Sequence, residues 1–531
     1  MSANTAPHAH GRGGFLGDDA ATRGAILAAL VAVFVGALDL TVIAAILPRI
    51  VTDLQINTAD IDRYVWIVNG YLLAYIVAIP IVGRLSDLVG RRRMFLIALA
   101  LFIIGSAWCA VADSLWSLVA ARAVQGIGGG ALLPITMALV GDLLPPQRRT
   151  GALGLVGAVD TLGWVLGPLW GALIVGLVAT DAPWRWVFAI NIPLALIALF
   201  AVRRQPGVTR EKVTSDWLRH LDLIGTALLA VMLVALNLGL SAGGEIGGAT
   251  SGGRALGGTR NPLAEWTLPM LGIAAVSAVL LVLHERRTPY PLLPPHLFRR
   301  PAFSAAIAAN FVVGAALIVA MVDVPVVVTL LVDENRVSAV TALMMAPFTL
   351  LMAALSFGGG MWAGRSGERR VALIGLVLVF MGYAVLWWGL RDGHYPGLLP
   401  GLMLAGAGFG LVVAPIGAAA INAADAEDRG VAAALSLVFR LLGMTVSISG
   451  LTALGVYRLQ GLVNLTEDVV QLPGESTAEF FARQTEFLYE TIIPLTLQVV
   501  RETFLIAGVL ALVAVVPILA MTRMQRTEPT A

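Results

Sequence analysis

The sequence predicts an all-α membrane protein with fourteen transmembrane helices. The 531-residue chain is 58% hydrophobic and only 13% charged. Apolar runs long enough to cross a bilayer, which takes about 20 residues, recur along its whole length. One loop rich in glycine and arginine occurs twice, at matching places in the two halves. That duplication indicates an internal repeat.

The predicted spans form two groups of six, joined by an extra pair. Their approximate ranges are 25–47, 64–82, 94–112, 115–140, 150–177, 185–202, 221–242, 265–284, 303–331, 337–359, 371–390, 397–423, 430–457 and 500–522. We expect five parts: a disordered cytoplasmic tail (1–24), an N-terminal six-helix bundle (25–202), a linker with two extra spans (203–302), a C-terminal six-helix bundle (303–522) and a second cytoplasmic tail (523–531).

Basic residues predict how the chain is oriented. Of the 35 Lys and Arg residues, 23 fall in the termini and the even-numbered loops, 9 in the odd-numbered loops and 3 within or at the edge of spans. Positive charge is retained on the cytoplasmic side of a membrane. We therefore expect a multi-pass protein of the cytoplasmic (inner) membrane with both termini in the cytoplasm.

The segment 83–93 lies between the second and third spans and reads GRLSDLVGRRR. Its glycines let two helix ends approach closely, and its aspartate lies among arginines, where it can pair with a neighbouring helix. Arginines alone are ordinary in a cytoplasmic loop, but the glycine and aspartate spacing favours a functional loop. A degenerate copy follows at 360–370. We predict a conformational gate formed by Gly83, Asp87, Gly90, Arg91, Arg92 and Arg93.

Five ionisable residues lie within predicted spans, where a charge is costly and usually functional. Asp39 is expected to face a cavity, find a partner or take a proton; the alternative is a carboxylate that bonds helix ends in one state. Arg122 stays charged at any physiological pH, so its distance from a carboxylate links conformation to proton affinity. We expect Asp39 and Arg440 to pair or to exchange partners, and count Asp160 and Asp323 as further candidates. Asp323 is equally well explained as a residue wetted by the outer aqueous phase.

The fifth span carries glycines four residues apart, a spacing that lets helices touch backbone to backbone, and a Gly-Pro step that bends the helix. These residues are Gly163, Gly167, Pro168 and Gly171. Close packing alone is the simpler explanation of the same pattern.

About 43 residues, 458–500, separate the last two spans, and a connection of this length is unusual. Apolar residues within it recur close to helical spacing. We expect helical extensions of the last two spans on the outer, periplasmic side, joined by a turn near 472–474. The apolar residues are candidates for a substrate path or for docking of a carrier, or else form a stabilising cap: Phe480, Phe481, Phe487 and Ile492.

These motifs resemble those of the fourteen-span drug:proton antiporter branch of the major facilitator superfamily. The loop matches the pattern G-x-x-x-D-x-x-G-R-(R/K)-(R/K), the fourth span R-x-x-Q-G-x-G, and the sixth W-R-W-x-F-x-x-N-x-P. In that branch the first-span aspartate, here Asp39, is tied to proton coupling, and the Gly-Pro-x-x-Gly motif distinguishes exporters from importers. Asp160 stands one position before the place where the family carries a glutamate, which Thr161 occupies here, so its coupling role stays open.

The resemblance extends to the mycobacterial multidrug-efflux and triacylglycerol exporters in the segments 71–80, 131–136, 322–324 and 440–458. It implies a major facilitator fold and proton-driven export of triacylglycerol or other amphiphiles, with a general multidrug:proton antiporter as the alternative. It implies no cofactor besides the proton gradient. The implied partners are membrane lipids, a lipid or amphiphilic substrate and a periplasmic lipid-carrier lipoprotein, and we expect a monomer that binds no nucleic acid.

Other classes of function lack the residues they require. The six histidines lie in loops, in tails or at a span end, and Cys109 is the only cysteine, so we expect neither a metal site nor an enzyme. The only lysine, Lys212, follows Glu211, which excludes a phosphate-binding Gly-Lys-Ser/Thr motif. A proton-coupled importer shares the fold but not the exporter motif, and a pure scaffold has no need of buried charges.

Overall fold

A computed structural model of the chain describes residues 19–55, 66–204, 222–243, 266–391, 393–464 and 476–521. This part of the chain is helical and contains no strand. It includes fourteen helices that are long and apolar enough to cross a membrane, which confirms the predicted all-α membrane fold. Residues 20–24, expected to belong to a disordered tail, form the first turn of a helix, whereas 1–18, the second expected tail and the turn near 472–474 lie outside the described residues.

The first half consists of α1 (Ala20–Asp53), α3 (Trp66–Val89), α4 (Arg91–Val111), α5 (Leu115–Leu143), α6 (Pro146–Leu177) and α7 (Trp184–Arg203). The linker pair is α9 (Leu223–Gly243) and α11 (Thr267–Glu285), followed by the short α12 (Pro295–Phe298). The second half consists of α13 (Pro301–Leu331), α14 (Glu334–Ser366), α15 (Glu368–Gly389), η2 (Tyr395–Leu398), α16 (Leu399–Asn422), α17 (Arg429–Val463), α18 (Thr477–Phe487), η3 (Leu488–Ile492), α19 (Ile493–Val513) and α20 (Val515–Ala520).

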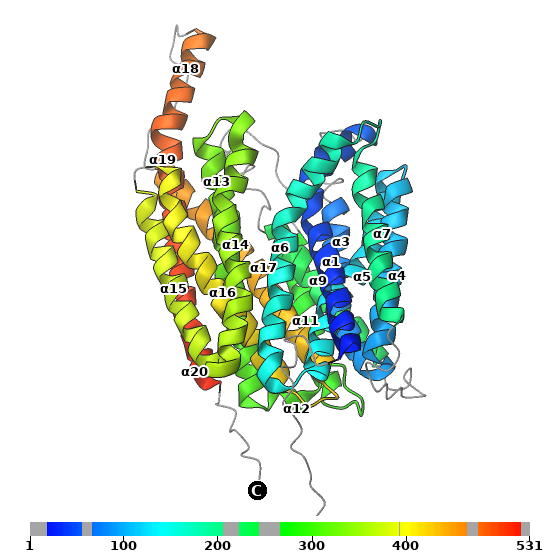
Figure 1. The fold of residues 1–531 in the computed structure, drawn as a ribbon. Helices are drawn as coiled ribbons and strands as arrows, with labels where there is room; N and C mark the ends of the chain where they lie inside the picture. The colour runs from blue at the N-terminus through cyan, green and yellow to red at the C-terminus, as the bar shows by residue number, and fades with distance from the viewer. Residues whose placement is uncertain are drawn as a thin grey trace, which may run out of the picture.

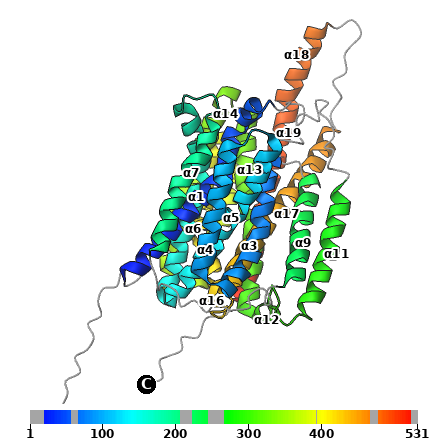
Figure 2. The ribbon, with the colours of Figure 1, turned by 90° about the vertical axis from the view of Figure 1, so that its right-hand side faces the viewer.

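The second half repeats the packing pattern of the first. In the first half α1 packs against α6 and α7, and α5 packs against α3 and α4. In the second half α13 packs against α17 and α19, and α16 packs against α14 and α15. Helices at equal places in the two halves therefore make equal contacts, as expected of an internal repeat. The linker helices α9 and α11 pack against each other at one side of the bundle, where α9 also contacts α3 and α17 (Figure 2).

The duplicated loop also has one backbone conformation in both halves. Gly90 has φ 102° and ψ 139°, and Gly367 has φ 90° and ψ 141°. A positive φ of this kind favours glycine because it has no Cβ atom. Each glycine directly precedes the third helix of its half, so the sequence match between 83–93 and 360–370 is a structural match as well.

We call one end of the bundle the basic end; Figure 1 shows it at the bottom, with α12 and α20. Its arginines include Arg84, Arg91, Arg149, Arg300 and Arg429. At the opposite end, α18, η3 and α19 form one helical run, and α18 projects beyond the other helices (Figures 1 and 2). The predicted helical extension of the last span is therefore present.

Candidate functional site

Asp39 lies at the centre of a buried polar cluster formed by α1, α5 and α7. Its Oδ2 accepts a hydrogen bond from the Arg122 guanidinium at 2.6 Å. Its Oδ1 accepts hydrogen bonds from the side-chain amides of Gln125 at 3.0 Å and Asn191 at 2.7 Å. All four side chains are at most 1% exposed. Because every partner donates an N–H, the arrangement fits an ionised carboxylate.

Aromatic rings and a helix neighbour hold Arg122 in this cluster. Its Cζ lies 4.0 Å from the ring centroid of Tyr71 and 5.6 Å from that of Phe188. Contacts between a cation and a ring gain strength when both are removed from water. Arg122 also donates a hydrogen bond to Oε1 of Gln125 at 2.8 Å. The spacing of three residues places both side chains on the helix face that meets Asp39.

Asp160 and Arg440 lie in a second site, between the two halves. Both line a cavity of about 30 Å³ enclosed by α5, α6, α13, α16 and α17. A cavity of this size has room for about one or two water molecules. Asn310 also lines it and donates a hydrogen bond to the hydroxyl of Ser436 at 2.7 Å. In this conformation the site therefore holds two opposite charges but has no room for a lipid.

The expected pair between Asp39 and Arg440 is not formed in this structure. Asp39 binds Arg122 within the first half, whereas Arg440 shares the central cavity with Asp160. Thr161 donates its hydroxyl to a carbonyl one turn earlier in α6, at 2.8 Å, so Asp160 and not Thr161 faces the second half. The sequence shows which helix carries each charged residue. It does not show how each helix is rotated about its axis, and that rotation decides which charges meet.

Asp323 takes part in a contact within the second half. Its carboxylate accepts a hydrogen bond from the hydroxyl of Thr503, which joins α13 to α19. Asp323 is partly buried and does not line the cavity of Asp160 and Arg440. Its expected role in proton coupling stays a prediction.

The glycine motif of α6 brings its backbone onto α1. A Cβ at Gly163 would lie 2.8 Å from the carbonyl oxygen of Phe34, and a Cβ at Gly167 would lie 2.6 Å from that of Leu38. Gly171 makes a third close contact one turn further along. No larger side chain fits these positions without moving one of the two helices. The motif therefore fixes the distance between α6 and the helix that carries the buried carboxylate.

Pro168 interrupts the hydrogen bonding of α6, and α1 supplies the missing donor. Proline has no N–H, so the carbonyl of Trp164, one turn earlier, loses its usual helical partner. The hydroxyl of Thr41 donates a hydrogen bond to this carbonyl at 2.8 Å. Thr41 thus ties α1 to α6 two residues away from Asp39.

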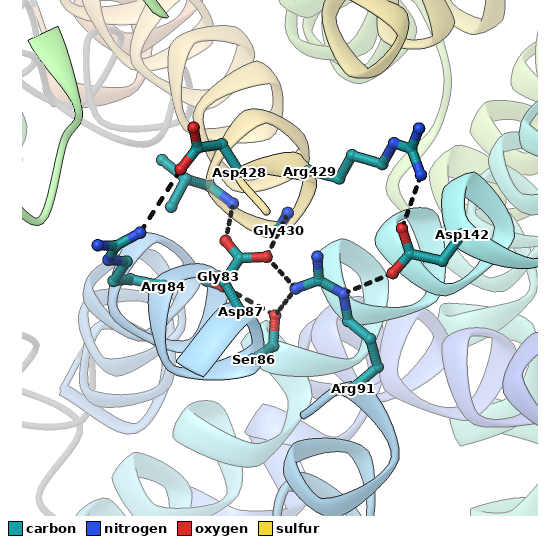
Figure 3. Close-up of polar contacts among 10 residues, drawn as sticks. Gly83, Arg84, Ser86, Asp87, Arg91, Asp142, Asp428, Arg429 and Gly430 are labelled. Carbon is teal, nitrogen blue, oxygen red and sulfur yellow. Dashed lines mark hydrogen bonds and ion pairs between the residues drawn. The ribbon is translucent and has the colours of Figure 1, made fainter. Parts of the chain in front are cut away.

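Asp87 joins the two halves at the basic end by capping a helix of the second half (Figure 3). Its carboxylate oxygens accept hydrogen bonds from the backbone N–H groups of Gly430 and Val431, each at 3.0 Å. These groups belong to the first turn of α17, where N–H groups have no partner within the helix. The partial positive charge of a helix N-terminus favours an anion there. A carboxylate of the first half therefore holds the start of α17 in place.

Arg91 extends this contact through a second carboxylate. It pairs with Asp87, and its Nε donates a hydrogen bond to Asp142 at 3.1 Å. Asp142, at the end of α5, also accepts a hydrogen bond from Arg429 of the second half at 2.9 Å. The resulting chain of alternating charges crosses from one half to the other (Figure 3).

Two glycines allow the halves to meet closely beside these charges. A Cβ at Gly83 would lie 2.8 Å from the carbonyl oxygen of Gly430, so α3 touches α17 there. A Cβ at Gly360, the counterpart of Gly83 in the repeat, would lie 2.6 Å from the carbonyl oxygen of Thr150, so α14 touches α6. The two contacts are equivalent in the repeat, and both lie toward the basic end.

A polar network replaces the Asp87 contact at the second of these places. Glu368 follows the turn glycine in the repeat, as Arg91 does in the first copy. Its Oε1 accepts hydrogen bonds from the amide of Asn422 at 2.9 Å and the hydroxyl of Thr150 at 3.5 Å. Arg149 donates a hydrogen bond to Oδ1 of Asn422 at 2.7 Å. The first and second halves are thus joined twice, and the described protein is closed at its basic end.

Arg92 and Arg93, the last members of the predicted gate, lie differently from Arg91. Arg92 donates a hydrogen bond to the carbonyl of Arg203 at 2.8 Å, at the end of α7 within its own half. Arg93 is exposed in the first turn of α4. Arg91, by contrast, bonds to the network that joins the halves.

A group of three potential metal ligands also lies at the basic end: His296, Asp425 and Asp428. His296 and Asp428 are bonded to each other at 2.8 Å, and Arg300 binds Asp425 at 2.5 Å. Arg84 lies 3.5 Å from Asp428 as well. Two nearby arginines oppose a cation, so these residues fit a link between α12 and the α16–α17 connection better than a metal site.

The apolar residues of the extension stand outside the bundle: Phe480, Phe481, Phe487 and Ile492. Phe481 is 59% exposed, and the other three are partly buried. The helix that carries them begins with a capping box, in which Ser476 and Glu479 each bind the backbone of the other. Helix α18 therefore has a capped N-terminus and presents an exposed aromatic ring at the end of the protein opposite the basic end.

Sequence reasoning missed several of the polar partners. Asp142, Glu368 and Asn422 lie at helix ends, where polar residues are usual at a membrane surface and draw no attention. Ser106 accepts a hydrogen bond from Gln125 at 2.9 Å, and no motif contains it. Asn191 belongs to the motif recognised in the sixth span, but its partner was not foreseen. Its hydrogen bond to the buried carboxylate of Asp39 explains why an amide side chain occupies this position.

Known sequences are similar to this chain over most of its length. Residues 29–448 match the family model described as Major Facilitator Superfamily. A triacylglyceride transporter of Mycobacteroides abscessus is 36% identical over 452 residues, 82% of each chain. Those of Mycolicibacterium smegmatis and Mycobacterium tuberculosis are 37% and 36% identical, over 82% and 84% of this chain and 76% and 85% of their own.

Solved structures of other transporters are similar to it in fold. The proton:xylose symporter XylE, bound to 6-bromo-6-deoxy-D-glucose, has a TM-score of 0.58 at 15% identity and covers 93% of this chain and 95% of its own. The human organic anion transporter TETRAN has a TM-score of 0.56 at 16% identity, with 92% and 99% covered. At these identities the likeness concerns the fold alone.

Proposed function

The chain belongs to the Major Facilitator Superfamily and is a membrane transporter rather than an enzyme, and we propose that it is a proton-driven exporter of triacylglycerol or a similar amphiphile. The observation that carries the coupling is the Asp39 cluster, a carboxylate buried in the membrane-spanning part with Arg122 as its counter-ion. A group of this kind is costly in a bilayer and marks a proton or ion path.

The choice of a lipid rests on the relatives and on the extension. Relatives that are 36–37% identical over more than four-fifths of this chain carry the name triacylglyceride transporter. A lipid with long acyl chains has to leave the membrane against its own hydrophobicity. The projecting α18, with Phe481 exposed, offers an apolar surface at the end where such a molecule would emerge. We propose that this surface guides acyl chains or docks a lipid-carrier lipoprotein.

The coupling we propose follows from the hydrogen bonds of Asp39. In the conformation closed at the basic end, Asp39 is ionised and holds α1, α5 and α7 together through Arg122, Gln125 and Asn191. Protonation from the opposite end removes the charge that Arg122 pairs with, so these bonds weaken and α1, α5 and α7 can shift against one another within the first half. Opening of the basic end then returns the proton and admits the next substrate.

The distribution of arginines supports the orientation that we propose for the protein in the membrane. The basic end is taken as cytoplasmic because positive charge stays inside. Both termini are then cytoplasmic, the membrane is the cytoplasmic (inner) membrane, and α18 is periplasmic. The proton gradient serves in place of a cofactor, and the transporter acts as a monomer.

The substrate class is tested in proteoliposomes that contain the full chain and an imposed proton gradient. Movement of a fluorescent triacylglycerol and of a cationic dye is followed in parallel. Gradient-dependent lipid movement supports the proposal. Dye movement without lipid movement would instead make the protein a general multidrug:proton antiporter, and no movement of either would reject proton-driven export of both classes.

A further inference from the structure

A cavity of about 650 Å³ lies near the opposite end, between α13, α15 and α19. Every residue that lines it belongs to the second half, so it is separate from the interface between the halves and from the Asp39 cluster. Its volume falls within the range of small-molecule sites, about 300–1,000 Å³. The proposed transport mechanism leaves this cavity unused.

Two arginines stand on the polar side of the cavity. Arg501 donates a hydrogen bond from Nε to the carbonyl of Trp387 at 3.0 Å, and its Cζ lies 5.3 Å from the Trp387 ring, which fixes the guanidinium. Arg391 is exposed directly after the end of α15 and forms no ion pair with another described residue. Glu502 also lines the cavity, but Arg458 binds its carboxylate at 3.1 Å. Among the described residues that line the cavity, the polar side therefore carries an excess of positive charge.

The other side of the cavity is apolar. The residues that contribute to it are Leu331 of α13, Leu390 directly after α15, and Ile493 and Leu497 of α19, and three of these four are buried. A small inorganic anion would leave this wall without a partner. A molecule with both a charged head and apolar chains uses both sides.

The cavity lies at the level where lipid headgroups are expected. The membrane-spanning helix α15 ends at Gly389, two residues before Arg391. Trp388 is 63% exposed beside it, and Tyr489, which lines the cavity, is 65% exposed. Exposed Trp and Tyr at the end of a span are typical of the interface between hydrocarbon and water.

We propose that this cavity binds the headgroup of a net-anionic phospholipid, with the phosphate between Arg391 and Arg501 and the acyl chains along the apolar wall. The planar guanidinium presents paired N–H donors that match phosphate oxygens. The bound lipid fastens the base of the projecting helix to the end of α15. This inference does not depend on the transported substrate or on proton coupling.

Native mass spectrometry of the full chain, stripped of lipid and titrated with dioleoylphosphatidylglycerol or dioleoylphosphatidylcholine, tests this site. The anionic lipid should bind more tightly than the zwitterionic one. Arg391→Gln should weaken binding of the anionic lipid by about tenfold, since charge-assisted hydrogen bonds are lost, and Arg391→Lys should restore part of it. Arg391 is exposed, so this variant should fold and stays informative if Arg501→Gln does not.

Arg336→Gln is the matched control, because Arg336 is exposed near the start of α14 and does not line the cavity; it should leave both affinities unchanged. Equal binding of the two lipids, or binding that Arg391→Gln does not change, would overturn the proposal. Inorganic phosphate that displaces the anionic lipid at millimolar concentration and itself loses affinity in Arg391→Gln would show a free-anion site, and that outcome also overturns it.

Discussion

The carboxylate of Asp87 lies 3.0 Å from the backbone nitrogen of Gly430, although the two residues belong to different halves of the repeat. The first is the only acid in the segment 83–93, and the second lies in the first turn of a helix, where N–H groups would otherwise have no partners. This charge therefore forms one of the two links that close the basic end. The copy of the loop at 360–370 has Gly364 in place of the aspartate and uses other polar groups.

We expect Asp87→Asn to favour opening of the basic end. Hydrogen bonds to charged groups contribute about 1.5–3 kcal/mol each, so losing the charge should shift the closed-to-open ratio by roughly tenfold or more. A cysteine in place of Met137, which lines the central cavity, should then react faster with a membrane-impermeant thiol reagent applied from the basic end. The native Cys109 is buried and should contribute no background.

Arg92→Gln is the control for that experiment, because Arg92 binds the end of α7 within its own half. Its reaction rate at the introduced cysteine should equal that of the protein with Asp87 intact. If Asp87→Asn reacts no faster than this control, the capping contact does not govern closure.

We expect Gly360→Ala to disturb closure and Gly358→Ala to leave it intact. A Cβ at Gly360 would lie 2.6 Å from the carbonyl oxygen of Thr150, whereas one at Gly358 would meet no atom within 4 Å. Overpacking of this kind costs about 1–3 kcal/mol, while alanine in an open helical position gains up to about 1 kcal/mol. The cysteine assay and the apparent midpoint of thermal unfolding check both variants. Equal behaviour of the two alanines would contradict the close contact of α14 with α6.

The bond from Thr41 to the Trp164 carbonyl predicts a coupled pair of substitutions. Thr41→Val leaves a partly buried carbonyl without a donor and should lower the free energy of unfolding by about 1–3 kcal/mol. Pro168→Ala supplies an N–H to the same carbonyl from within α6, so Thr41→Val should cost clearly less in that background. A double-mutant cycle on urea or thermal unfolding measures the difference. Additive effects would show that Pro168 and Thr41 act independently.

Much of this architecture is predictable because its signals are local. Apolar runs predict the spans, and the duplicated loop predicts an internal repeat, which the shared positive φ of Gly90 and Gly367 supports. Arg122 and Gln125 meet the same carboxylate because a spacing of three residues places them on one helix face.

The polar contacts between side chains of different helices could not be predicted from these local signals. Whether Asp39 meets Arg122 or Arg440 depends on how α1, α5 and α17 are rotated, and no periodicity in their nearly uniform apolar sequence records that. Asp142 and Glu368 acquire importance only because α17 and α6 begin beside them. Contacts between halves are set by tertiary packing, and a single sequence does not display them.

The most direct measurement of the central claim compares the unmodified protein with Asp39→Asn in proteoliposomes, under an imposed proton gradient and without one. The substitution keeps the shape of the side chain and removes its titratable group. We predict that Asp39→Asn loses gradient-driven movement of the lipid or dye that the unmodified protein carries, while exchange of that substrate down its own gradient persists at unchanged expression. Gradient-driven transport that continues in Asp39→Asn would contradict the account and place the coupling proton elsewhere.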